Sequence, residues 1–269
     1  MNIEELEIKK RETLSEIKEK ELGNYTSAEL QVLEDQLLLI EDDINKFARI
    51  SIECGVGKRF INANLLDFKN VFTDAYLFDN NSLSENITFG KKEDAEIVKK
   101  KVDFCGVLSK YSDDFIRHLS VGTSFIFVGP HGSGKTHAAH AVAFACAEKY
   151  LSVRKDLLDF YVIRMSDMMA MFSRRNEMGD QTVDKIRKKQ LLIVDEVGSE
   201  KHSDSGWTIE QFVGRVLRYR YDNCLPTIIT SNANAVDFMR AYGSRAETIL
   251  LGNSFHTILL YTKKDMRKG

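Results

Sequence analysis

The sequence predicts a three-layer α/β domain around a five-stranded parallel sheet, preceded by a small helical arm. Short apolar runs alternate with helical segments, and each run is continuously apolar, which is typical of strands covered on both faces. The pattern changes where Gly55 and Gly57 follow a helical stretch, so we expect two domains, residues 1–54 and 55–269. The expected strands are 125–128, 160–165, 191–194, 227–230 and 257–261.

Residues 1–50 predict two antiparallel helices. Gly23 ends the first helix, and Thr26 with Glu29 forms a capping box for the second. The second helix carries an apolar seam of coiled-coil spacing, which packs against the first helix or docks on another protein. Docking gains support because so small a hairpin buries little apolar area by itself. The seam consists of Leu30, Leu33, Leu37, Ile40, Ile44 and Phe47.

Composition and charge limit the classes of protein to which this chain can belong. The 269 residues are 43% hydrophobic and 29% charged, an ordinary globular balance. We expect a cytoplasmic protein without a membrane span, because no run approaches the roughly 18 apolar residues that a membrane helix needs. The four cysteines lie far apart, which argues against a zinc site or a disulfide framework. Residues 1–50 carry a net charge of −6 and the remainder +4, which suits a protein partner for the arm and a nucleic acid for the body.

The strongest motif, residues 129–136, lies between an apolar run and a helical stretch. It reads GPHGSGKT and fits the P-loop pattern in full. Its glycines let backbone N–H groups wrap phosphates, and the start of the following helix adds a partial positive charge. Lys135 would reach the β- and γ-phosphates of ATP, and Thr136 would bind Mg²⁺. The predicted ATP-binding residues are Gly129, Pro130, His131, Gly132, Ser133, Gly134, Lys135, Thr136 and His137.

A second motif, the Walker B segment, is the apolar run 191–194 with the two acids that follow it. Asp195 would hold Mg²⁺ together with Thr136, largely through water, and Glu196 would polarise the attacking water. A glutamate placed to activate water favours hydrolysis over transfer to a small acceptor. The two motifs therefore predict an ATPase.

A third signal is a polar pair at the end of the run 227–230. ATPases of this topology place at this point a residue that positions the attacking water. We expect Asn232 to fill this role, with Ser231 as the alternative.

With these motifs, residues 57–261 resemble AAA+ ATPases, and more narrowly the bacterial replicative helicase loaders of the DnaC/DnaI type. The segment Gly252-Asn253-Ser254 before the last strand is the more particular match. Such loaders lack a C-terminal helical lid, and only eight residues follow Tyr261, so we expect no lid. The resemblance implies a slow ATPase, used as a switch, that helps place the hexameric replicative helicase on single-stranded DNA. It also implies docking through residues 1–54 and allows a homo-oligomer on the helicase.

In these loaders a helical insertion before Walker B touches single-stranded DNA. The matching stretch, residues 166–190, carries six basic residues against four acids. We expect Arg174 and Arg175 to neutralise phosphates and Phe172 to stack on a base. The alternative is a solvated helix pair.

One departure from the family pattern concerns an arginine pair near the end of the domain. Only Arg245 matches, so this residue is either an arginine finger that reaches a neighbour's nucleotide or a surface salt-bridge former. The departure is compatible with a divergent loader of the phage or plasmid type.

Two other classes share the P-loop. Helper ATPases of the IstB type serve a transposase, and residues 252–254 favour the loader over them. A small-molecule kinase is opposed by the adjacent Asp195 and Glu196 and by the missing arginine-rich lid.

Overall fold

The computed structural model describes residues 3–21, 27–68, 72–79, 99–173, 177–198, 211–233, 249–250 and 254–262. The chain forms two compact units, Met1–Asn62 and Ala63–Gly269, which are considered separately below. This division lies further along the chain than the expected boundary after residue 54. Within the described ranges, every helix is too short or too polar to cross a bilayer.

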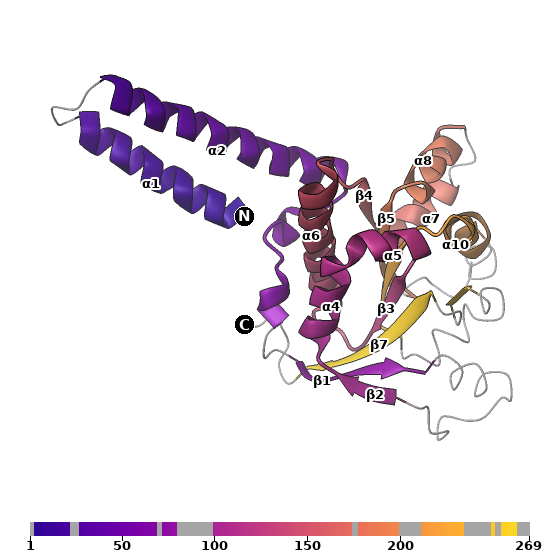
Figure 1. The fold of residues 1–269 in the computed structure, drawn as a ribbon. Helices are drawn as coiled ribbons and strands as arrows, with labels where there is room; N and C mark the ends of the chain where they lie inside the picture. The colour runs from indigo at the N-terminus through magenta and orange to yellow at the C-terminus, as the bar shows by residue number, and fades with distance from the viewer. Residues whose placement is uncertain are drawn as a thin grey trace, which may run out of the picture. The chain divides into compact units, whose positions relative to one another are not determined.

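The first unit is a helical hairpin. Helices α1 (Ile3–Glu21) and α2 (Ser27–Glu53) pack side by side, and the 3₁₀ turn η1 (Lys58–Phe60) follows them (Figure 1). Leu33 and Ile40 of the expected seam are buried, together with Ile17 of α1. An ion pair of 2.7 Å between Lys10 and Glu41 also joins the two helices. The described part of the seam therefore packs within the hairpin, whereas the side chains of Ile44 and Phe47 lie outside the described residues.

A different part of α2 carries apolar side chains that stay exposed. Val32 is 56% exposed, and Leu39, two turns further along, is 69% exposed. Leu38, beside Leu39 in sequence, is 63% exposed. We call Val32, Leu38 and Leu39 the outer α2 surface.

The second unit contains a sheet of seven strands in the order β2-β1-β7-β3-β6-β5-β4. All five expected strands are present and parallel. The expected strand number is corrected to seven, because two antiparallel strands extend the sheet beyond β7. Since β6 lies between β3 and β5, the P-loop strand and the Walker B strand are not neighbours. The strands are β1 (Phe72–Phe78), β2 (Lys99–Val102), β3 (Ser124–Val128), β4 (Phe160–Arg164), β5 (Leu191–Val197), β6 (Thr227–Ser231) and β7 (Phe255–Thr262).

Helices cover both faces of this sheet (Figure 1). On one face, Phe125 and Phe127 of β3 contact Tyr111 and Phe104, with ring centroids 4.9 and 5.5 Å apart. Alternate side chains of β3 point to the other face, where Ile126 joins an apolar cluster. The first face carries α4 (Phe104–Asp113), α5 (Phe115–Val121) and α6 (Lys135–Arg154). The second carries α7 (Met165–Ser173), α8 (Glu177–Arg187) and the π-helix η4 (Phe212–Leu217).

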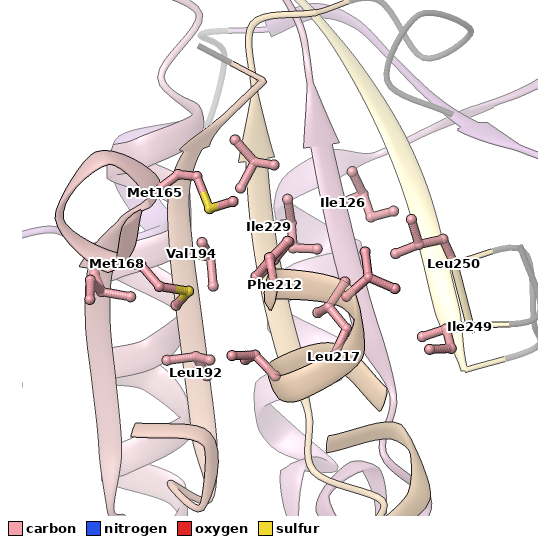
Figure 2. Close-up of a cluster of buried hydrophobic side chains, with 14 of the residues drawn as sticks. Ile126, Met165, Met168, Leu192, Val194, Phe212, Leu217, Ile229, Ile249 and Leu250 are labelled. Atoms are coloured by element: carbon pink, nitrogen blue, oxygen red, sulfur yellow. The ribbon is translucent and has the colours of Figure 1, made fainter. Parts of the chain in front are cut away.

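The apolar cluster on the second face holds the Walker B strand in place. Figure 2 shows Met165 and Met168 of α7 beside Val194 of β5, and Phe212 of η4 near Ile229 of β6. All five side chains are at most 1% exposed. The acids that follow Val194 therefore extend from a rigid part of the core.

Arg220 is the largest fully buried side chain among the described residues, and hydroxyl and carbonyl oxygens surround its charge. It lies on α10 (Arg218–Asp222) and is 1% exposed. Its guanidinium donates to Thr227 Oγ1 and to the carbonyl oxygens of Arg187, Lys189 and Pro226 at 2.5–2.9 Å. Burial lowers the pKa of Arg220 to about 9, so the group stays charged at neutral pH. Arg220 thereby ties the end of α8 to the start of β6.

Replacing Arg220 with methionine should destabilise the second unit without changing any residue of the nucleotide site. The substitution removes the guanidinium donor from the carbonyl oxygens of Arg187 and Lys189, and each acceptor left unpaired costs roughly 1–3 kcal/mol. We expect a loss of about 3 kcal/mol or more in the free energy of unfolding, measured by urea denaturation followed by circular dichroism. The control is Arg218→Met, which removes an exposed arginine from the same helix. Equal stability of the two variants would contradict the role given to Arg220.

Candidate nucleotide-binding site

The P-loop connects β3 to α6, as the sequence predicts. Gly134 is the N-cap of α6 and has a φ of +83°, a left-handed conformation that favours glycine. At Gly129 a Cβ atom would lie 2.6 Å from the carbonyl oxygen of Leu260, so a larger residue would clash with β7. The loop therefore opens onto the amino terminus of a 20-residue helix, where backbone N–H groups and the helix dipole favour phosphate.

The ammonium group of Lys135 lies within the loop. Its Nζ donates to the carbonyl oxygens of Gly129 and Pro130, each at 2.8 Å, and to Ser133 Oγ at 3.1 Å. Lys135 is only 6% exposed. A positive charge is thus fixed beside the backbone that would surround a phosphate chain.

Thr136 and Asp195 bring the P-loop and the Walker B segment together. Thr136 Oγ1 donates to Asp195 Oδ1 at 2.7 Å, and Asp195 is 4% exposed at the carboxyl end of β5. A hydroxyl and a carboxylate are hard oxygen ligands of the kind that Mg²⁺ prefers. The pair therefore fits the metal that the sequence predicts, and these two residues would hold it.

A neutral histidine lies behind this pair. His140 Nδ1 donates to the carbonyl oxygen of Thr136 at 2.7 Å, and His140 is 3% exposed. Burial lowers the pKa of His140, although the bond to Thr136 and the charge of Asp195 act in the opposite direction. The uncharged ring supports the first turn of α6 without adding a competing positive charge.

Glu196 follows Asp195 but is exposed. Its φ is +60°, which is unusual for a glutamate, and the pairing of β5 with β6 shifts register between Val194 and Val197. The change of backbone direction separates the two acids, with one buried against Thr136 and the other at the surface.

The end of β6 meets these acids through hydroxyl groups. Thr230 Oγ1 donates to Asp195 Oδ1 at 2.5 Å and accepts from the N–H of Glu196 at 3.0 Å. Ser231 Oγ donates to the carbonyl oxygen of Val197 at 2.7 Å. The sequence predicts Asn232 at this position, with Ser231 as the alternative, and does not indicate Thr230. Asn232 is half-buried just beyond β6, and its role in positioning water stays a prediction.

His137, the last of the predicted ATP-binding residues, contacts the segment that precedes the sheet. Its Nε2 lies 2.7 Å from Asp67 Oδ2, and its ring packs edge-on against Phe68. Asp67 and Phe68 both belong to the 3₁₀ turn η2 (Leu65–Phe68). His131 and Pro130 are exposed on the loop. The contribution of these side chains to nucleotide binding stays a prediction.

The expected DNA contacts have a mixed outcome. Phe172 of α7 is 6% exposed and belongs to the apolar cluster on the second face of the sheet. The Arg215 guanidinium lies 5.8 Å from its ring centroid. A buried ring offers no face to a base, so the prediction for Phe172 is wrong. Arg174, Arg175 and the candidate arginine finger Arg245 lie outside the described residues.

Known proteins with similar sequences are described as ATP-binding proteins and helicase loaders. Residues 98–256 match the family described as IstB-like ATP binding protein, a stretch that includes the P-loop, β5 and β6. Over 150 residues the chain is 27% identical to the replicative helicase loader DnaC of Escherichia coli K12. The aligned stretch covers 55% of this chain and 58% of DnaC. It is 28% identical over 115 residues to the replicative helicase loader DnaI of Bacillus subtilis, covering 41% of this chain and 33% of DnaI.

The fold agrees as well. A crystal structure of the DnaC helicase loader superposes with a TM-score of 0.53 at 21% identity, covering 76% of this chain and all of that one. The aligned sequence nevertheless spans little more than half the length of the E. coli loader. The chain belongs to the IstB-like ATP-binding protein family and contains an AAA+ domain of the DnaC type.

Proposed function

We propose that this chain binds ATP with Mg²⁺, hydrolyses it slowly, and uses the cycle to help place a replicative helicase on single-stranded DNA. The observation that carries the ATPase part is the contact between Thr136 Oγ1 and Asp195 Oδ1 at 2.7 Å. These residues are 59 positions apart in sequence, yet they bring the phosphate loop and the acidic strand end into one site.

Each residue of the site has one task in this proposal. Lys135 binds the β- and γ-phosphates, and Thr136 with Asp195 holds Mg²⁺, which when bound neutralises charge on the phosphates. Glu196 accepts a proton from the attacking water, while Asn232 orients that water. Arg245 is the candidate finger for a neighbouring molecule's nucleotide.

The loader part rests on the sequence similarity to DnaC and DnaI over the ATPase domain. In this proposal the helical arm, residues 1–54, docks on the helicase. Its net charge of −6 over residues 1–50 suits a basic surface on that partner. Arg174 and Arg175 would contact the DNA backbone, and binding to DNA would weaken as salt is added.

A second candidate function is favoured by the description of the matching family, IstB-like ATP binding protein. The resemblance to helper ATPases of the IstB type implies a transposase as the partner. The two candidates have the same nucleotide chemistry and differ in the protein partner.

A loading assay tests the proposal directly. Purified hexameric helicase is incubated with single-stranded DNA on beads, and the helicase retained is measured with and without this chain and ATP. We expect the chain with ATP to raise helicase retention severalfold. Glu196→Gln should still bind ATP but lose about a hundredfold in turnover, since removing a general base typically costs that much or more.

The control for Glu196→Gln is Glu148→Gln, which changes an exposed glutamate on α6. This control should match the unmodified chain in both binding and turnover. If the chain captures a transposase but no helicase, the IstB-type function replaces the loader function. If Glu196→Gln hydrolyses ATP at the full rate, Glu196 is not the general base.

A further inference from the structure

The Walker B acids lie at a bulge in the sheet. Val194 of β5 pairs with Ile229 of β6, and the next pair is Val197 with Ser231. Asp195 and Glu196 therefore both lie opposite one residue of β6, Thr230. A bulge of this kind redirects a side chain and is common beside active sites. Here it separates a buried aspartate from an exposed glutamate.

This bulge requires support from its surroundings. The φ of +60° at Glu196 is a left-handed conformation that costs a residue with a Cβ atom about 1 kcal/mol or more. The N–H of Glu196 donates to Thr230 Oγ1 at 3.0 Å. The threonine hydroxyl thus ties the bulged backbone to the neighbouring strand.

The same hydroxyl fixes the other acid. Thr230 Oγ1 donates its single proton to Asp195 Oδ1 at 2.5 Å, and Thr230 is 1% exposed. Asp195 Oδ1 also accepts from Thr136 at 2.7 Å. Two threonines therefore hold one carboxylate oxygen, and Thr230 also joins that oxygen to the backbone of Glu196.

A buried threonine in this sheet does not always use its hydroxyl in this way. Thr257 of β7 is also fully buried, yet its Oγ1 has no hydrogen-bond partner within the described structure. Valine has nearly the same shape as threonine, so valine would fill the space equally well at either position. The two bonds of Thr230 therefore point to a task beyond packing.

We infer that Thr230 is a positioning residue for ATP hydrolysis, acting through Asp195 and Glu196. Its hydroxyl sets the direction of the carboxylate that would hold Mg²⁺ and keeps the backbone of the general base in its bulge. This inference rests on the proposed ATPase function. It concerns the geometry of the two acids and leaves the phosphate contacts of the P-loop unchanged.

The test compares Thr230→Val, which removes the hydroxyl at constant shape, with Thr230→Ser, which keeps it. Thr257→Val is the matched control because it removes a buried hydroxyl without a partner from the same sheet. We expect Thr230→Val to lower kcat at least tenfold while the KM for ATP changes less than threefold. Thr230→Ser should recover most of the rate, and Thr257→Val should behave like the unmodified chain.

A second readout does not depend on turnover. Binding of a fluorescent ATP analogue is titrated with Mg²⁺, and the Mg²⁺ concentration for half-maximal binding is compared between variants. We expect this concentration to rise at least threefold in Thr230→Val and to return in Thr230→Ser. If the valine variant does not fold, as judged by circular dichroism, Thr230→Ala provides the same comparison with a smaller side chain.

The outcomes separate this inference from the proposed function. If the unmodified chain hydrolyses ATP and Thr230→Val matches it in kcat and Mg²⁺ dependence, the inference is overturned while the ATPase function stands. A serine variant as defective as the valine variant would also overturn it. If the unmodified chain binds no ATP, the proposed function fails and the inference fails with it. If it binds ATP without hydrolysing it, the Mg²⁺ titration decides the part that concerns Asp195.

Discussion

Lys135→Ala should weaken ATP binding at least a hundredfold. The ammonium group is fixed inside the loop by Gly129, Pro130 and Ser133, so its charge lies where the phosphates would bind. Charge-assisted hydrogen bonds contribute about 1.5–3 kcal/mol each, and losing the contacts to two phosphates is worth about 3 kcal/mol or more, which exceeds a factor of one hundred. Isothermal titration with ATP and Mg²⁺ measures the change.

The control for this prediction is Arg154→Ala, which removes a basic side chain from the last turn of the same helix. It should leave the Kd for ATP within a factor of two. Thermal unfolding of Lys135→Ala shows whether the P-loop variant is still folded, because its loop carbonyls lose a donor. A folded Lys135→Ala variant that binds ATP as tightly as the unmodified chain would remove the P-loop assignment.

The core of the fold and the nucleotide site were predictable because they rest on local signals. Continuous apolar runs located all five parallel strands, and the P-loop and Walker B motifs located Thr136 and Asp195, which the structure brings together. Of the two extra strands, β1 contains a short apolar run, Ala75–Phe78, although it was not among the expected strands, and β2 carries no such signal. β2 contains Lys99, Lys100 and Lys101, and it lies at the edge of the sheet, where charged side chains protect against unwanted pairing. An edge strand needs no apolar run, so composition could not reveal it.

Thr230 could not be found from the strand end alone. Its importance depends on β6 lying beside β5 and on the register shift that sets Asp195 and Glu196 against it. Both are properties of the assembled sheet. The sequence carries one weak signal, a threonine near the end of a buried strand and one residue before the expected polar pair.

The prediction for Phe172 failed for a different reason. Met165, Met168 and Phe172 follow one another at intervals of three and four residues, the spacing of a buried helix face. The structure places all three in the apolar cluster. This spacing indicates burial, whereas the resemblance to helicase loaders implied a contact with DNA.

The hairpin shows a similar limit. The seam spacing correctly indicated a packed helical face, and Leu33 and Ile40 are buried. Substituting Ile40 by aspartate would therefore damage the hairpin itself and could not report on docking. Val32 and Leu39 lie outside the seam and are exposed, so they are the better candidates for a partner surface.

The outer α2 surface leads to the second large expected effect. We predict that Val32→Ser with Leu39→Ser weakens the association of the chain with a replicative helicase roughly 30-fold. These side chains are 56% and 69% exposed, and burying their exposed parts against a partner would contribute about 2 kcal/mol in total. The association is measured by surface plasmon resonance with immobilised helicase.

A matched control distinguishes a docking surface from general apolar stickiness. Leu151 and Val153 near the end of α6 are 45% and 53% exposed, so Leu151→Ser with Val153→Ser makes the same kind of change in the ATPase unit. This control should bind the helicase as the unmodified chain does. Because serine adds no charge, the net charge of −6 over residues 1–50 is preserved, and any loss of binding reflects apolar contact.

Circular dichroism must show full helicity for both variants, since Val32 and Leu39 do not take part in the buried seam. Undiminished binding by the folded Val32→Ser, Leu39→Ser variant would exclude these two side chains as docking contacts.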